Sequence, residues 1–270
     1  PNLQQQLVEI GYQGKKLEEL ESFSATEKAN ILFIVQDPYT SYYDAKVVRD
    51  FVALTQKLGF KPIILPFKPN GKAMHIKGFL TRFSKTAKTQ AEFLNRVAKL
   101  NVPLVGVDPA IVLSYRDEYK EALGNSRGDF HVLTAHEWLT NQLNSNALQN
   151  AVKNIAKSDR TFEWHLFPHC TESTFMPNSP KEWQHIFAQF GQTLKVEKVG
   201  CCGMAGVFGH EVQNQTMSKD IYDVSWGKKL QGKDPNHCLA TGYSCRSQVK
   251  RYEKAILKHP VQALLEVLNN

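Results

Sequence analysis

Short apolar runs alternate with stretches of helical periodicity along this chain, and that alternation limits the possible folds more than any other feature. Apolar runs of strand length occupy residues 31–35, 62–65 and 102–107. Between them, apolar side chains recur at helical intervals over residues 44–58 and 87–100. Strands and helices that alternate in this way predict an α/β protein built around a largely parallel sheet.

The second half of the chain follows the same plan. Strand-like runs at residues 162–167 and 194–199 enclose a helical stretch at residues 180–190. A further transition from strand to loop surrounds residues 237–245, and a helix interrupted near a proline is expected over residues 247–268. Each half therefore predicts its own layer of strands and helices.

A constant offset relates the two halves. Gly59 and Gly71 recur 132 residues later as Gly191 and Gly203. We predict an α/β fold of two tandem, structurally related modules with mostly parallel sheets. Two unrelated α/β segments of similar length are the alternative. The expected domains are an N-terminal helical segment and the two modules, at residues 1–30, 31–150 and 151–270.

Composition and charge exclude several classes of protein. With 42% hydrophobic and 22% charged residues among 270, the chain can bury a sizeable core and is not disordered. The net charge of +7 comes from dispersed Lys and Arg residues without a nucleic-acid-binding motif, so no nucleic acid is expected as a partner. No apolar run approaches the ~20 residues that span a bilayer, so no transmembrane segment is expected. A start at Pro1 without a signal pattern suggests a piece of a longer cytoplasmic protein, with a peripheral position at the inner membrane as a second option.

All five cysteines lie in the second half, at Cys170, Cys201, Cys202, Cys238 and Cys245. An odd number in a chain without a secretion signal argues against a disulfide framework. Each group lies near the end of a predicted strand, and the carboxyl ends of parallel strands meet at one edge of a sheet. The thiols should therefore converge as a site for an iron–sulfur cluster or zinc. The alternative is that the cysteines are small hydrophobic residues buried in the core. It explains one or two of them, but not why all five lie close together in the second half of the chain.

Glycines surround the paired cysteines. Gly200, Gly203, Gly206 and Gly209 flank Cys201 and Cys202. Glycine adopts backbone angles closed to other residues and lets the backbone approach a bound group closely. This composition favours a ligand-binding loop over an ordinary core segment.

The sequence around the cysteines resembles a known domain. The resemblance rests on residues 169–172, 201–206 and 241–248, with Cys201-Cys202-Gly203 at its centre. These stretches are similar to the cysteine-rich CCG domain of heterodisulfide reductases and of the iron–sulfur subunits of glycolate oxidase and anaerobic glycerol-3-phosphate dehydrogenase. Taken whole, the chain resembles the C-terminal region of bacterial FAD-linked oxidases with iron–sulfur centres, of the D-2-hydroxyglutarate dehydrogenase type.

That resemblance implies electron transfer. A [4Fe–4S] cluster, cubane or non-cubane, would be held by all five cysteines: Cys170, Cys201, Cys202, Cys238 and Cys245. The implied partners are flavin and ferredoxin-like domains of the same polypeptide, where FAD oxidises a D-2-hydroxy acid, and a downstream electron acceptor. Catalysis then lies in a missing part of the protein. We therefore expect no catalytic residue in this chain and no activity from the chain alone.

The chain departs from the family pattern in two places. Six residues separate Cys238 from Cys245 where the family has a C-x-x-C pair, which makes Cys238 the weakest of the proposed ligands. The first module contains no cysteine, so it should bind no cluster and should act as a scaffold or docking surface. A zinc-stabilised interaction module and a heterodisulfide reductase-like thiol/disulfide site are the alternatives.

Polar residues occupy the corresponding strand ends of the first module. Asp37 and Asp108 each follow a predicted strand, and Arg116 lies in the helix after the second of them. An acid–base set is one interpretation. We favour structural roles, in which both aspartates cap helices and Arg116 pairs with Asp117 or Glu118.

Overall fold

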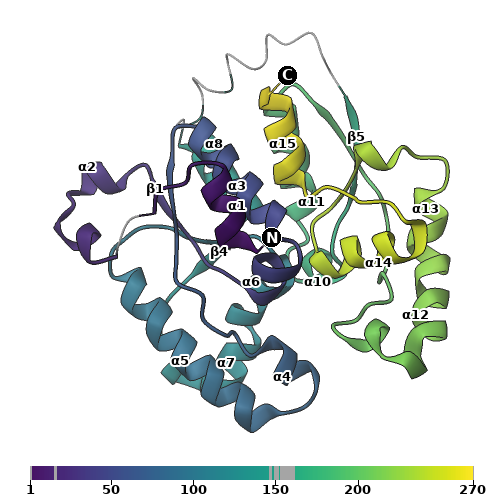
Figure 1. Ribbon diagram of the computed structural model, residues 1–270, viewed down its shortest axis with the longest axis horizontal. Coiled ribbons are helices and arrows are strands. Elements are labelled where there is room, and N and C mark those ends of the chain that lie inside the picture. The colour runs from purple at the N-terminus through teal and green to yellow at the C-terminus, as the bar shows by residue number, and fades with distance from the viewer. Residues whose placement is uncertain (1, 15–16, 146–147, 149–151, 153–161, 270) are drawn as a thin grey trace. The chain divides into compact units, whose positions relative to one another are not determined.

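The computed structural model describes residues 2–14, 17–145, 148, 152 and 162–269. The chain divides into two compact units, Pro1–Trp138 and Leu139–Asn270. Each unit consists of helices around its own parallel sheet (Figure 1). The predicted boundary between residues 150 and 151 lies outside the described residues.

The sheet of the first unit has four parallel strands in the order β2-β1-β3-β4. They are β1 (Ile31–Ile34), β2 (Lys61–Ile64), β3 (Leu104–Gly106) and β4 (Val132–Thr134). Every residue of β1 is buried, as expected for an inner strand of a parallel sheet that is covered on both faces. Hydrophobic periodicity predicted β1, β2 and β3. It missed β4, because only Val132 and Leu133 are apolar there, whereas β3 lies within a longer apolar run.

Helical segments form most of the rest of the described first unit. The longest, α5 (Leu80–Ala98), packs against α4 and α7 (Figure 1). It begins at Leu80 rather than at residue 87 as predicted, because its first turns are mostly polar. The other segments are α1 (Leu3–Glu9), η1 (Leu17–Ser22), α2 (Ala25–Lys28), η2 (Tyr39–Tyr43), α3 (Ala45–Lys57), α4 (Lys72–Ile76), α6 (Pro109–Arg116), α7 (Glu118–Leu123) and η3 (Gly124–Arg127). The division between the units falls within α8 (Ala135–Asn144).

The sheet of the second unit has three parallel strands in the order β6-β5-β7. They are β5 (Glu163–Phe167), β6 (Thr193–Val196) and β7 (Cys238–Ala240). Leu166 of the central strand pairs with Val196 on one side and Leu239 on the other. Trp164, Leu166 and Phe167 are completely buried, so β5 forms the centre of this core.

Helices of the second unit connect and cover these strands. The predicted helix over residues 247–268 is two helices, because α14 ends at a left-handed Lys254 (φ 56°) and Pro260 starts α15. The segments are α10 (Cys170–Phe175), α11 (Ser179–Gln189), η4 (Phe208–His210), η5 (Val212–Asn214), α12 (Gln215–Tyr222), η6 (Asp223–Gly227), α13 (Lys228–Leu230), η7 (Pro235–His237), α14 (Tyr243–Glu253) and α15 (Pro260–Asn269). None of the helices in the described ranges combines the length and the hydrophobicity needed to cross a bilayer.

The two units share a strand order. In each, the first strand lies between the second and the third, as β2-β1-β3 and as β6-β5-β7. The first unit adds β4 at one edge, and the described part of the second unit has no counterpart to it. The predicted fold class, two related α/β modules with mostly parallel sheets, is therefore confirmed.

Candidate cysteine-rich site

Four of the five cysteines follow strands of the second unit. Cys170 begins α10, just beyond β5, and Cys245 lies in the first turn of α14, just beyond β7. Cys201 and Cys202 lie in the loop that follows β6. Because the three strands are parallel, all three segments leave the sheet at the same edge.

The thiols of these residues form what we call the four-cysteine group. Cys201 is hydrogen-bonded to Cys170 and to Cys202, and Cys202 is also hydrogen-bonded to Cys245. Cys170 and Cys245 interact electrostatically. All four are free thiols; Cys170 and Cys201 are half-buried, and Cys202 and Cys245 are buried. The structure thus brings together sulfur atoms that are far apart in the sequence.

Hydrogen bonds concentrate negative charge on Cys201. Those from the thiols of Cys170 and Cys202, followed by those from the N–H groups of Gly203 and Ala205, hold its pKa far below the usual range for a thiol. The Gly203 nitrogen lies 3.3 Å from Cys201 Sγ. The same contacts, together with burial, raise the pKa of Cys170 and Cys202. Backbone N–H groups directed at sulfur suit a thiolate ligand.

Contacts from two helices hold the loop that carries Cys201 and Cys202. Gly203 has φ +83°, and a Cβ atom there would lie 2.1 Å from the Ser218 carbonyl oxygen. Ser218 Oγ donates to the Gly203 carbonyl at 2.7 Å, and Gln248 Nε2 donates to the Cys202 carbonyl at 3.0 Å. Sequence reasoning did not identify Ser218 or Gln248, because neither carries metal-binding chemistry. The one signal for Gln248 was its place in the motif at residues 241–248.

His169 orients the segment that carries Cys170. Its backbone N–H donates to Thr241 Oγ1 at 2.9 Å, and its Nδ1 accepts a hydrogen bond from the Thr171 N–H at 3.2 Å. A Cβ atom at Gly242 would lie 2.3 Å from the His169 ring, so glycine permits this close packing. The imidazole therefore caps α10 and ties it to the loop before Cys245.

Cys238 belongs to the same buried cluster as Cys202 and Cys245 but lies at the other end of β7. It is the first residue of β7, at the amino end of the strand, whereas the group lies beyond the carboxyl ends. Burial raises the pKa of its thiol to about 11, and the charges that act on it are those of Lys233, Asp234 and Glu197. Its role as a fifth ligand remains a prediction, and the geometry favours the other four cysteines.

The interactions among these thiols link all four residues, because Cys170 and Cys245 also act on each other. Their hydrogen bonds run from Cys170 through Cys201 and Cys202 to Cys245. Within the described residues, no three His, Cys, Asp or Glu side chains are arranged to hold one metal ion.

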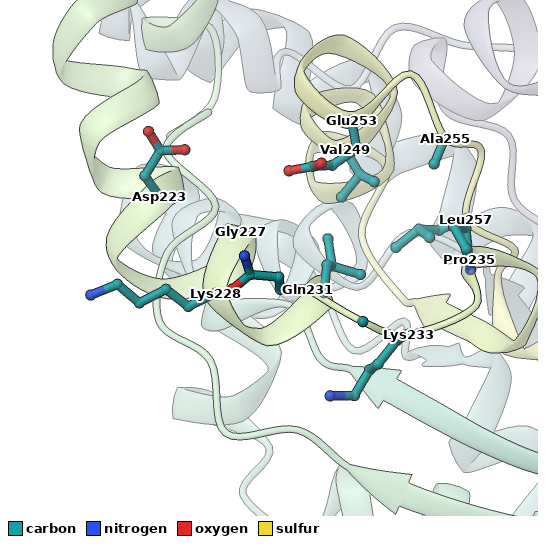
Figure 2. Close-up of a pocket in the computed structure, with 12 residues that line it drawn as sticks. Asp223, Gly227, Lys228, Gln231, Lys233, Pro235, Val249, Glu253, Ala255 and Leu257 are labelled. Carbon is teal, nitrogen blue, oxygen red and sulfur yellow. The ribbon is translucent and has the colours of Figure 1, made fainter.

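A cavity of about 470 Å³ opens between η6, α13 and α14 of the same unit (Figure 2). Its lining combines apolar side chains such as Val249 with the charged Glu253 and Lys228. Val249 lies one helical turn after Cys245 and belongs to the same buried cluster as Cys202 and Cys245. Val249 thus connects the wall of the cavity to the core that contains the cysteines.

The first unit has buried carboxylates at the corresponding edge of its sheet. Asp37 follows β1 and accepts hydrogen bonds from the N–H groups of Tyr39 and Thr40, at 2.8 and 3.0 Å. Asp108 follows β3 and accepts a hydrogen bond from the Ala110 N–H at 3.0 Å as the N-cap of α6. The predicted capping role of Asp108 is confirmed, and Asp37 binds the first turn of η2 in the same way. Burial, and then the negative charge of Asp108, raise the pKa of Asp37 to about 6.

Arg116 pairs with a residue that the sequence did not indicate. Its Nη1 and Nη2 donate to the two carboxylate oxygens of Glu137, at 3.0 and 2.5 Å. Glu118, one of the predicted partners, forms an ion pair with Lys72. Residues one and two apart on a helix do not face each other, whereas β4 and α8 bring Glu137 to Arg116.

Fold and site together define a class: an α/β protein of two related parallel-sheet units, the second of which gathers four thiols beyond its strands. No family model matches the chain. The chain is 82% identical over 268 residues to the D-2-hydroxyglutarate dehydrogenase of Haemophilus influenzae, and 56% identical over 268 residues to that of Escherichia coli. Each alignment covers 99% of this chain and 26% of the relative.

A more distant relative bears the same name and is also matched over only part of its length. The D-2-hydroxyglutarate dehydrogenase of Pseudomonas putida is 38% identical over 247 residues, which cover 92% of this chain and 23% of that protein. The chain therefore spans about a quarter of the length of these relatives. It is similar to one part of larger oxidoreductases.

Proposed function

We propose that this chain is the iron–sulfur electron-transfer region of an FAD-dependent D-2-hydroxy-acid dehydrogenase that oxidises 2-hydroxyglutarate. The observation that carries the proposal is the convergence of four thiols from three loops of the second unit. Similarity to D-2-hydroxyglutarate dehydrogenases supports the reaction of the whole protein. The resemblance to FAD-linked oxidases supports flavin as the electron donor.

The donor set fits an iron–sulfur cluster. Thiolates are the usual ligands of such clusters, and the four-cysteine group offers four thiols from three loops. The N–H groups of Gly203 and Ala205 already donate to Cys201. Hydrogen bonds of this kind offset the negative charge of thiolate ligands, which favours the reduced state and raises the reduction potential.

The residues of this chain have distinct tasks in the proposed function. Cys170, Cys201, Cys202 and Cys245 hold the cluster, which when bound accepts and releases electrons one at a time. Ser218 of α12 and Gln248 of α14 fix the loop that carries Cys201 and Cys202, so that little rearrangement accompanies a change in charge. Oxidation of the hydroxy acid to a 2-oxo acid releases two electrons and two protons, and takes place in a part of the protein outside this chain.

Electron donors and acceptors can reach the four-cysteine group from two sides, which supports a role in passing electrons on. Cys170 and Cys201 are half-buried, so a donor can come close to them from solvent. The cavity beside α14 comes close to the same core through Val249 (Figure 2). A site that both receives and passes on electrons benefits from access on more than one side.

Metal analysis of protein handled without oxygen tests this proposal. After reconstitution with iron and sulfide, we expect brown protein with broad visible absorption and about four iron atoms per chain. Colourless protein with one tightly bound zinc ion would show instead that the second unit is a zinc-stabilised interaction module.

A matched pair of variants tests the ligand set. Cys201→Ser should lose most of the iron, because Cys201 contacts two other thiols of the group. Cys238→Ser removes one thiol as well but should retain the iron, because Cys238 lies at the opposite end of β7. Equal loss of iron in both variants would contradict the four-cysteine assignment and favour all five cysteines as ligands.

A further inference from the structure

A cavity of about 630 Å³ in the first unit is lined mainly by cationic and polar groups. It lies between the end of α6, η3 and the residue before β4. Arg116, Lys120, Arg127 and His131 line it, and Asp129 is the carboxylate among its described lining residues. This cavity belongs to the unit without cysteines, and the proposed function makes no use of it.

The guanidinium of Arg127 is fixed in place. Its Nε donates to the Tyr115 carbonyl at 2.7 Å, Nη1 to the Gly128 carbonyl at 2.8 Å and Nη2 to the Phe130 carbonyl at 3.0 Å. It also stacks on the Phe130 ring, with the guanidinium carbon 4.1 Å from the ring centroid. A guanidinium has five N–H donors, so two remain for a ligand.

The charge of Arg127 is not neutralised by its hydrogen bonds, because carbonyl oxygens are uncharged. Within the described residues, no carboxylate forms an ion pair with Arg127, and Asp129 acts on it only at longer range. Arg116, by contrast, is paired with Glu137. The cavity therefore has a rigid cation without a counter-ion, beside the exposed ammonium of Lys120.

His131 experiences the resulting positive potential. Burial, followed by the positive charge of Arg116 and Arg127, lowers its pKa. The charge of Glu137 acts in the opposite direction but does not reverse the shift. An anion in the cavity would relieve this repulsion.

Asn95 of α5 holds the wall of the cavity. Its Nδ2 donates to the Arg127 carbonyl at 2.7 Å, and its Oδ1 accepts a hydrogen bond from the Phe130 N–H at 3.2 Å. Gly128 has φ +73°, and a Cβ atom there would lie 2.4 Å from the Asn95 amide. The loop is thus built in the conformation that presents Arg127, and a ligand would not have to order it.

We propose that this cavity binds a small organic or inorganic polyanion that carries phosphate or carboxylate groups. The free N–H groups of a fixed guanidinium bind either group through charge-assisted hydrogen bonds. Lys120 adds a second positive charge at the exposed side. Binding there gives the first unit a ligand-binding role of its own, separate from the cysteines of the second unit.

Calorimetric titration of the whole chain with pyrophosphate and with citrate tests the proposal and separates the two chemistries. We expect one saturable site per chain, and the tighter of the two probes identifies phosphate or carboxylate as the preferred group. Lys120→Gln should weaken binding about fivefold, because it removes one charged contact at the exposed side of the cavity. Lys57→Gln, which removes another exposed lysine, in α3 and outside the cavity, should leave the affinity unchanged.

The NMR titration of His131 provides a second, site-specific measurement. Saturation with the bound anion should raise its pKa toward the ordinary value, because the anion offsets the charges of Arg116 and Arg127. The absence of saturable binding for both probes would overturn the proposal. Equal weakening by Lys57→Gln and Lys120→Gln would do so too, because it would show general attraction to a chain of net charge +7.

Discussion

The segment that follows the central strand carries different chemistry in the two units. In the second unit it begins with Cys170, a thiol that contacts another thiol. In the first unit it contains Asp37, a completely buried carboxylate that accepts hydrogen bonds from the backbone and from Thr40 and is repelled by Asp108. A buried carboxylate near a like charge is more easily protonated than one in water. The corresponding position therefore carries a thiol of the four-cysteine group in one unit and a carboxylate that caps a turn in the other.

Replacing Asp37 by asparagine should change the pH dependence of stability. The folded pKa is about 6, against an ordinary 3.8, so between these values the folded protein binds more protons than the unfolded chain. The contribution of Asp37 to the free energy of unfolding therefore falls as pH rises from about 4 to about 6, by up to roughly 3 kcal/mol, and then levels off. An amide at this position does not ionise, so the Asp37→Asn variant should lack this fall.

Urea unfolding of both proteins between pH 4 and pH 7 measures the difference. Asp117→Asn, which alters an exposed aspartate of the same unit, serves as the control and should follow the native pH profile. A difference between native protein and Asp37→Asn that stays constant with pH would contradict a raised pKa for Asp37.

At the scale of the elements, the conformation of the loop after β6 depends on two helices, α12 and α14. Ser218 of α12 and Gln248 of α14 bind the backbone of Gly203 and Cys202. α14 also carries Cys245, so one helix both supplies a thiol of the four-cysteine group and positions the loop that carries Cys201 and Cys202. The geometry of the four-cysteine group therefore depends on the packing of α12 and α14 and not only on the strands.

Gly203→Ala should disrupt this arrangement. The new Cβ atom would lie 2.1 Å from the backbone oxygen of Ser218, which cannot move without a shift of α12. We expect a loss of about 2–4 kcal/mol in the free energy of unfolding and faster loss of reconstituted iron. Gly232→Ala is the matched control, because Gly232 has a similar φ of +76° but no atom within 4 Å of its Cβ position. It should cost only about 1 kcal/mol, and an equal cost for both variants would show that backbone strain, not the contact with Ser218, explains the effect.

At the scale of the whole molecule, the chain has the architecture of a component rather than of a complete dehydrogenase. Both units are parallel α/β layers, and the thiols of the second are the residues to which we assign redox chemistry. The chain matches about a quarter of each relative. A flavin site and a site for the hydroxy acid therefore belong, in our proposal, to the remaining three quarters.

The reconstituted chain alone should fail to reduce an artificial dye with D-2-hydroxyglutarate as the donor. It should still be bleached by dithionite, because electron uptake requires only the cluster. The full-length H. influenzae relative serves as the positive control for the assay. Dye reduction by the chain alone, above the rate without substrate, would disprove the proposal that the hydroxy acid is oxidised outside this chain.

The sequence alone was enough to predict the layers and where the thiols would gather. Buried strands and amphipathic helices are encoded by side chains a few residues apart, so β1, β5 and α3 are visible in the apolar pattern. Parallel strand order then predicts that the residues just after each strand meet at one edge, as Cys170 and Cys201 do.

Only the tertiary structure decided which distant residues meet. The sequence did not show that Cys238 begins β7 and so lies at the amino end of the strand, whereas Cys245 lies beyond the carboxyl end. Arg116 reaches Glu137, and Arg127 joins Lys120 in one cavity, because β4 and η3 fold back on α6 and α7. Such contacts depend on strand register and helix packing, and a shift of a single residue along a strand would turn a side chain to the opposite face. Local sequence patterns do not encode that register, because it is set by the packing of the whole unit.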